Sequence, residues 1–170
     1  PSLPPRYNIA PSQIVACVRT HPETQEREFA DLKWGLVPSW ANDPSIGHKL
    51  INAQSETVAE KASFRHAFKQ QRCLVLADGF YEWKREGKMK QPYYIRMKDG
   101  RLFAFAGLWE RWETQEPALE TCALLTTTSN DLMKPIHHRM PVILPEFAFY
   151  SWLNPDLHNP MYLTGLLQPI

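Results

Sequence analysis

A chain of 170 residues is long enough to bury a substantial core, and one domain is the natural expectation at this length. The hydrophobic fraction of 44% and the charged fraction of 22% are typical of a globular protein. The net charge of +1 excludes a polycation, so nucleic-acid binding would require a local basic patch. Because no apolar run reaches transmembrane length and the N-terminus lacks a signal-peptide core, we expect no membrane partner.

The first part of the chain predicts two strands after a proline-rich lead-in over residues 1–11. Alternating apolar residues indicate strands over 14–19 and 28–34, with a polar turn over 20–25 between them. A proline-flanked tryptophan, Trp40, follows the second strand, and we expect it to be exposed.

A short helix and several more strands are predicted downstream. Phe64, Ala67 and Phe68 fall at helical spacing, and Ser63 can cap the helix that they form. Strand-like runs and a helix opened by proline follow over residues 91–97, 102–112, 121–127, 140–144 and 145–152. The sequence predicts an α+β fold with a mainly antiparallel, barrel-like β core and a few peripheral helices.

The three cysteines, Cys17, Cys73 and Cys122, lie far apart in apolar, strand-like runs. Their spacing matches neither a zinc site nor a disulfide framework, which suits a reducing compartment. We expect three buried, unreactive thiols and no metal.

The first candidate for chemistry lies in residues 73–84. This stretch reads as an apolar strand, an Asp-Gly turn at 78–79 and an aromatic strand, because Asp-Gly between two strands favours a tight turn. In the second strand one carboxylate, Glu82, stands between Tyr81 and Trp83. A carboxylate flanked by large rings is costly to desolvate unless it is paired, hydrogen-bonded or protonated, so Glu82 is a candidate functional residue.

Two other polar groups leave alternatives open. His137 and His138 stand beside Arg139, and they are either surface residues of a loop or an acid/base imidazole next to a phosphate-binding guanidinium. Asn52 and Glu56 can serve a site or make local turn bonds. The six tryptophans can pack the core or stack on bases. No hydrolase motif is visible, so these residues alone do not identify the reaction.

Six segments, in family order, resemble the SRAP family (SOS-response-associated peptidase). They span nearly the whole chain: Pro5–Pro11, Trp34–Trp40, Asn52–Thr57, Ala77–Trp83, Phe105–Trp109 and Ile136–Pro141. The resemblance implies a protein that senses abasic sites in single-stranded DNA and crosslinks to them. The implied chemistry uses an N-terminal cysteine, exposed by autocatalytic removal of Met. Its amine and thiol capture the sugar aldehyde as a Schiff base and then a thiazolidine.

The resemblance also implies the site residues. The catalytic residues would be Glu82, His137 and Asn52, and the DNA-binding residues would be Asn8, Trp40, Gln54, Trp83 and Arg139. No cofactor is implied. The expected partner is single-stranded DNA containing abasic sites, and the expected state is a monomer in the cytoplasm, associated with the nucleoid if the protein is bacterial.

Two departures from the family pattern matter. None of the three cysteines occupies the position of the family's cysteine, which lies upstream of the lead-in. We therefore expect a single SRAP-like domain over residues 1–170 that is truncated at its N-terminus. Gln54 replaces a usual arginine, which removes one positive charge. Two main hypotheses follow: a crosslinking protein in its complete form, or a module that binds single-stranded DNA without covalent chemistry. A general peptidase is a third alternative, unsupported by any separate protease triad.

Overall fold

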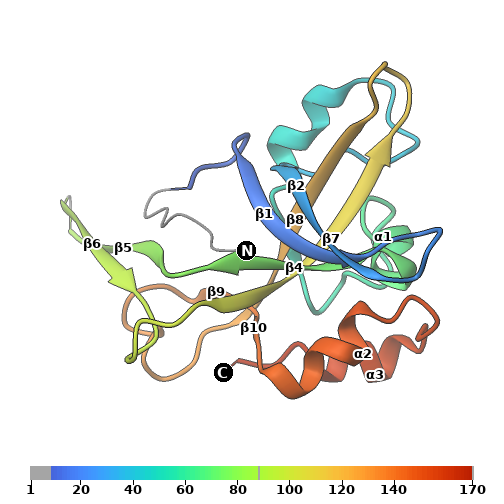
Figure 1. The fold of residues 1–170 in the computed structure, drawn as a ribbon. Coiled ribbons are helices and arrows are strands. Elements are labelled where there is room, and N and C mark those ends of the chain that lie inside the picture. Colours follow the sequence, from blue (N-terminus) through green and yellow to red (C-terminus); the bar gives the residue numbers. More distant parts are fainter. Residues whose placement is uncertain (1–8, 88, 170) are drawn as a thin grey trace.

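The structure is a computed structural model and describes residues 9–87 and 89–169 (Figure 1). One long strand, β8 (Leu119–Thr128), contacts four others. On one edge it pairs antiparallel with β7 (Phe103–Trp112) and then β9 (Arg139–Pro141). On the other edge it pairs parallel with β2 (Arg27–Trp34) and then β3 (Asn52–Gln54). Because both of its edges are paired and both faces are covered, β8 is a nearly continuous buried run.

The remaining strands close the sheet on itself. β1 (Ile14–Thr20) pairs antiparallel with β2 and with β4 (Arg72–Ala77), and β4 pairs with β7. The path β7–β4–β1–β2–β8 therefore returns to β7. β10 (Ile143–Leu144) pairs antiparallel with the first residues of β7, with Ile143 opposite Phe105 and Leu144 opposite Ala104. The sheet is ring-like and mostly antiparallel without being a formal barrel, which confirms the expected fold class.

Alternate side chains of β8 enter two different apolar clusters. Ala123 and Leu125 join the cluster that packs against the helices, whereas Cys122 and Leu124 join the cluster on the other side. This follows from the two-residue period of a strand. The expected burial of all three cysteines is confirmed, since each is 0% exposed in the second cluster.

Three short helices contribute buried residues to the first apolar cluster: α1 (Arg65–Gln70), α2 (Phe149–Leu153) and α3 (Pro160–Gly165). Two 3-10 turns, η1 (Pro44–Lys49) and η2 (Glu146–Ala148), lie elsewhere along the chain. Figure 1 shows α2 and α3 together below the sheet. None of the helices in the described residues is long and apolar enough to cross a bilayer. The expected cap of α1 is wrong, because Phe64 is the N-cap residue and no side chain caps the helix.

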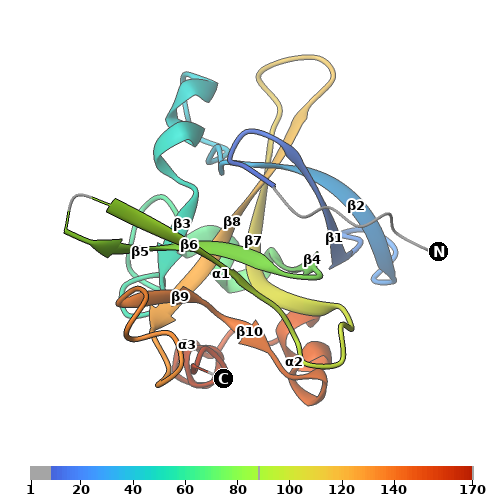
Figure 2. The same ribbon diagram turned by 90° about the vertical axis from the view of Figure 1, so that its left-hand side faces the viewer.

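The expected change of direction at 78–79 is present, but it does not form a hairpin. The chain bends there, but β5 (Phe80–Glu86) pairs with β6 (Met89–Ile95) in a separate two-stranded sheet, not with β4. Gly79 does not take a positive φ; a Cβ there would overlap the Tyr94 ring. Glycine therefore permits a close approach to Tyr94, and the β5–β6 hairpin projects from the ring of strands (Figures 1 and 2).

Arg72, at the start of β4, joins the sheet to the helices. Its guanidinium donates to the carbonyls of Phe68 and Lys69 in α1 at 2.9 and 2.7 Å, and to Trp152 in α2 at 2.7 Å. It also donates to the carbonyls of residues 154 and 157. Burial lowers the pKa of Arg72 to about 10, so the group remains charged at neutral pH. A buried cation is stable here because carbonyl oxygens replace the water that it loses.

Glu110, on β7, is a buried carboxylate outside the cavity described below. Its side chain is 2% exposed and accepts hydrogen bonds from Gln71 at 2.7 Å and from the backbone of Ser39. His66 Nδ1 lies 3.2 Å from one carboxylate oxygen. Burial raises the pKa of Glu110, and the charge of His66 opposes that shift.

Replacement of Arg72 by leucine should lower the free energy of unfolding by about 3 kcal/mol or more, because buried carbonyls lose their donor. Urea unfolding measures the change. The matched control is Arg65→Leu, at an exposed position of α1, which should change stability by about 0.5 kcal/mol or less. Equal losses in the two variants would contradict the role assigned to Arg72.

Glu110 should make stability depend on pH. A carboxyl with a raised folded pKa contributes stability that is complete below its ordinary value of 4.5 and is lost as pH rises through the folded value. Each unit of elevation corresponds to about 1.4 kcal/mol. From about pH 4 to about pH 8, the wild type should therefore lose stability relative to Glu110→Gln. Chemical unfolding across this range tests it, with the exposed Glu113→Gln as the control; a flat difference for Glu110→Gln would refute it.

Candidate functional site

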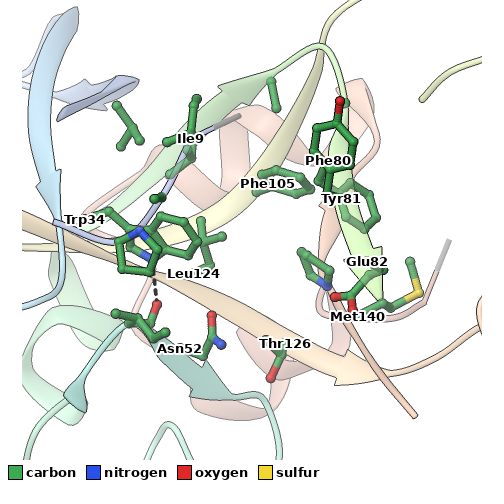
Figure 3. Close-up of a pocket in the computed structure, with 18 of the residues that line it drawn as sticks. Ile9, Trp34, Asn52, Phe80, Tyr81, Glu82, Phe105, Leu124, Thr126 and Met140 are labelled. Carbon is green, nitrogen blue, oxygen red and sulfur yellow. Dashed lines mark hydrogen bonds between the residues drawn. The ribbon is translucent and has the colours of Figure 1, made fainter. Parts of the chain in front are cut away.

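A pocket of about 370 Å³ opens between the ring of strands and the β5–β6 hairpin (Figure 3). Four residues predicted from the sequence, far apart in the chain, line it: Asn52, Glu82, His137 and Arg139. Ile9, Ala10 and Pro11, at the N-terminal side of the described chain, line it too. The fold therefore assembles an amide, a carboxylate, an imidazole and a guanidinium around one space.

β3 and β8 position the amide of Asn52. Asn52 pairs in register with Leu124 of β8, and the alternation of β3 places Ala53 in the core and Asn52 and Gln54 on the other face. Asn52 lines the pocket, whereas Gln54 is exposed and does not line it. In Figure 3 the Asn52 side chain points into the open space beside Thr126.

The carboxylate of Glu82 comes from the hairpin. Glu82 pairs with Tyr93 of β6, is partly buried and lies beside Met140 with its side chain toward the pocket (Figure 3). Phe80 and Tyr81 line the same wall. The hairpin, rather than the ring of strands, therefore carries the group that we expect to move protons.

The backbone around His137 fixes its imidazole. The N–H of Arg139 donates to His137 Nδ1 at 3.1 Å in the tautomer that carries its proton on Nε2. The carbonyl of Arg139 lies 3.1 Å from the same Nδ1, where a protonated ring would donate to it. Ser129 holds the segment, since its hydroxyl donates to the His137 carbonyl at 2.5 Å and its N–H donates to the His138 carbonyl at 3.1 Å. The Arg139 backbone therefore offers Nδ1 a partner in either tautomer.

Arg139 is held by two partners. Its Nη1 and Nη2 donate to the two oxygens of Glu56 at 2.9 and 3.0 Å. Nη2 also lies 3.0 Å from the carbonyl and 3.1 Å from the hydroxyl of Thr126. The hydrogen bonds from Arg139 lower the pKa of Glu56, which therefore stays ionised at neutral pH. Sequence reasoning did not find this ion pair, because its residues are more than eighty positions apart.

The other wall of the pocket is apolar. Val15, Trp34, Phe105 and Leu124 contribute to it, and the Trp34 indole donates to the Ile51 carbonyl at 2.9 Å (Figure 3). Sequence reasoning missed these residues as site residues, because each reads as an ordinary buried strand position. A wall of this kind excludes water from one side of a bound molecule and strengthens the electrostatic interactions on the other side.

Comparison with known proteins places this chain in a family. A family model described as SOS response associated peptidase (SRAP) matches residues 1–170. The chain belongs to the SRAP family. Abasic site processing protein YoqW of Bacillus subtilis strain 168 is 48% identical over 167 residues, which cover 97% of this chain and 74% of the relative. Abasic site processing protein HMCES of Gallus gallus is 37% identical over 182 residues, covering 88% of this chain and 54% of the relative.

A solved structure has the same fold. The crystal structure of a Bacteroides thetaiotaomicron protein superposes with a TM-score of 0.82 at 33% identity, over 94% of this chain and 70% of that chain. The family resemblance predicted from six sequence segments is thus confirmed. The roles of the individual residues stay predictions.

Four of the five DNA-binding residues expected in this SRAP chain, including Gln54, either do not line the pocket or have side chains outside the described part. Trp40 is exposed as expected, at 58%, but it does not line the pocket. Trp83 lies on β5 opposite Pro92, and its side chain is outside the described part of the chain. Asn8 is outside the described residues altogether.

The pocket of this SRAP chain has acid/base groups but no thiol among the described residues that line it. Cys17, Cys73 and Cys122 are all in the core. A hydrogen bond with Cys17, together with burial, raises the pKa of Cys122 well above its ordinary value. Thiols of this kind are poor nucleophiles, because the thiolate is the reactive form.

Proposed function

We propose that this SRAP chain processes abasic sites in single-stranded DNA and that the pocket receives the ring-opened sugar. The observation that carries the proposal is the convergence of Asn52, Glu82 and His137 on one pocket. The names of the relatives support the substrate, since they are called abasic site processing proteins.

In a form of the chain that carries an N-terminal cysteine, that residue would supply the nucleophiles. Its neutral α-amine attacks the sugar aldehyde to give a carbinolamine, which loses water to form a Schiff base. The cysteine sulfur then adds to the imine carbon, the nitrogen takes up a proton, and a thiazolidine ring closes. An α-amine titrates well below a lysine, and ring closure within one residue benefits from a high effective concentration. The position of Ile9, Ala10 and Pro11 at the pocket supports delivery of such a group from the N-terminal side.

The pocket residues then divide the proton transfers. Loss of water from the carbinolamine requires a proton on the departing oxygen, which His137 Nε2–H can donate. Glu82, as the carboxylate, accepts a proton from the attacking amine or from the thiol. Asn52 has both a donor and an acceptor, so its amide can orient the sugar oxygen without changing charge.

The strand around the lesion would run across the mouth of the pocket. Trp40 and Trp83 remain candidates to stack on neighbouring bases, and Arg139 remains a candidate for phosphate, so affinity should fall with salt. Gln54 supplies no charge at its position, and phosphate binding there would depend on uncharged hydrogen bonds.

A second candidate function is recognition of single-stranded DNA without a covalent bond. The burial of all three cysteines at 0% exposure favours it for residues 1–170 taken alone, because no thiol of this sequence reaches the pocket. Under this alternative the complex would form in a salt-sensitive way and would dissociate completely on denaturation.

The catalytic roles can be tested in a form of the chain extended by a Cys-bearing N-terminal segment. Glu82→Ala and His137→Ala should each slow covalent trapping of a single-stranded abasic oligonucleotide about 100-fold or more, the usual effect of losing an acid or base. Denaturing gels measure the adduct over time. His158→Ala, at an exposed position outside the pocket lining, is the matched control and should trap at the wild-type rate.

Two results would contradict the covalent proposal. An unchanged trapping rate in Glu82→Ala and His137→Ala would remove their assigned roles. No adduct with the extended form, despite binding in native gels, would favour the non-covalent candidate.

A further inference from the structure

We infer that Glu56 is a built-in competitor for Arg139, so that a DNA phosphate must displace the Glu56 carboxylate before Arg139 can bind it. The inference rests on the proposed function, because it assumes that a DNA strand crosses the pocket. It concerns specificity and affinity at the pocket mouth rather than proton transfer.

The geometry leaves Arg139 no complete edge for a phosphate. A guanidinium binds oxyanions best through two parallel N–H groups. One such edge, Nη1 with Nη2, is taken by the two Glu56 oxygens at 2.9 and 3.0 Å. The second N–H of Nη2 is directed to Thr126, 3.0 Å from its carbonyl and 3.1 Å from its hydroxyl. Bidentate binding of a phosphate therefore requires one of these partners to leave.

Glu56 is the partner that can leave. The Glu56 side chain is 48% exposed, whereas that of Arg139 is 18% exposed. An exposed carboxylate is well hydrated once it has separated from its partner, so separation costs little free energy. For the same reason, exposed ion pairs contribute little to stability. The Thr126 contacts would keep Arg139 in place, because they come from the β8 backbone and from a buried side chain. On leaving, Glu56 gives up its bonds to Arg139, a 3.1 Å hydrogen bond from Ser55 and a hydrogen bond from its own backbone N–H.

The charge of Glu56 also opposes the strand directly. A phosphate that approaches Arg139 meets a carboxylate on the same guanidinium, and the two like charges repel at short range. The occupation of Arg139 by Glu56 and the repulsion between Glu56 and the phosphate both lower the affinity for DNA, and neither depends on the base or sugar. They should therefore act equally on an abasic strand and on an intact strand of the same length.

Glu56→Gln tests the inference, because it removes the charge and keeps the size of the side chain. In residues 1–170, this variant should bind an intact single-stranded oligonucleotide about 3- to 10-fold more tightly at low salt. The slope of log K against log salt concentration should become steeper by the amount expected for about one additional phosphate contact. Fluorescence anisotropy over a salt series measures both. Glu60→Gln removes an equal charge from the same loop, outside the pocket lining, and should increase affinity by less than about 2-fold through general charge alone.

The dependence on Arg139 is tested in an Arg139→Gln background, where Glu56→Gln should give no more than the gain of Glu60→Gln. Weaker binding by Glu56→Gln in the wild-type background would overturn the inference and make Glu56 a support for Arg139. A gain that persists without Arg139, or one equal to that of Glu60→Gln, would overturn it as well.

Failure of the proposed function has a different signature. If the wild type bound abasic and intact strands equally and the extended form gave no adduct, the proposed function would fail, while the intact-strand comparison would still report on Glu56. Absence of DNA binding in both the wild type and Glu56→Gln would overturn both.

Discussion

The pairing of β8 on both edges is the constraint on which the site depends. Near its C-terminal end, β3 lies on one edge and β9 on the other, with Thr126 opposite Gln54 and Pro141. This register brings Asn52 and Arg139 to the same pocket from segments more than eighty residues apart. A shift of one residue in either pairing would turn the functional side chains to the opposite face, because the side-chain period of a strand is two.

The two remaining groups are held in different ways. His137 is held by the backbone N–H of Arg139, at the start of β9, and by the hydroxyl of Ser129, directly after β8, which donates to the His137 carbonyl. Glu82 lies on a hairpin that pairs with neither β4 nor β7, so its position relative to His137 depends on how the hairpin packs. The acid/base pair therefore combines one group on the central sheet with one on a separate two-stranded sheet. Packing of Phe80 against Phe103 and Phe105, with ring centroids 6.4 and 5.6 Å apart, connects the two.

Sequence patterns predicted the features that are local. The strands β1 and β2, the turn between them and the exposure of Trp40 follow from alternation and from proline, and the structure has them. The Asp-Gly signal at 78–79 marks a bend rather than a hairpin, because Gly79 is required by the ring of Tyr94, a contact made across β5 and β6. The Ser63 cap failed because the helix begins two residues later, at Arg65.

The site itself could not be derived from spacing. Asn52, Glu82 and His137 are separated by many residues of ordinary strand pattern, and only the family resemblance grouped them before the fold was known. The family resemblance did not predict the Glu56–Arg139 ion pair either, because nothing in the local sequence of either residue indicates a partner 83 positions away. Likewise, the carbonyl acceptors of Arg72 cannot be found from local sequence, because three of the five come from segments about eighty residues away.

The proposed chemistry needs a reactive nucleophile and groups that transfer protons, and the described core and pocket differ in which of these they can supply. Reactive thiols need access and a lowered pKa, and the core of this fold offers neither, since Cys17, Cys73 and Cys122 are inaccessible. Proton transfer, in contrast, needs groups held in fixed positions by the fold, and the pocket provides them. A nucleophile carried by the N-terminal side of the chain would meet this prearranged set at Ile9–Pro11. The described fold is therefore compatible with the proposed chemistry, in which the polar groups of the pocket transfer protons and the nucleophile comes from the N-terminal side of the chain.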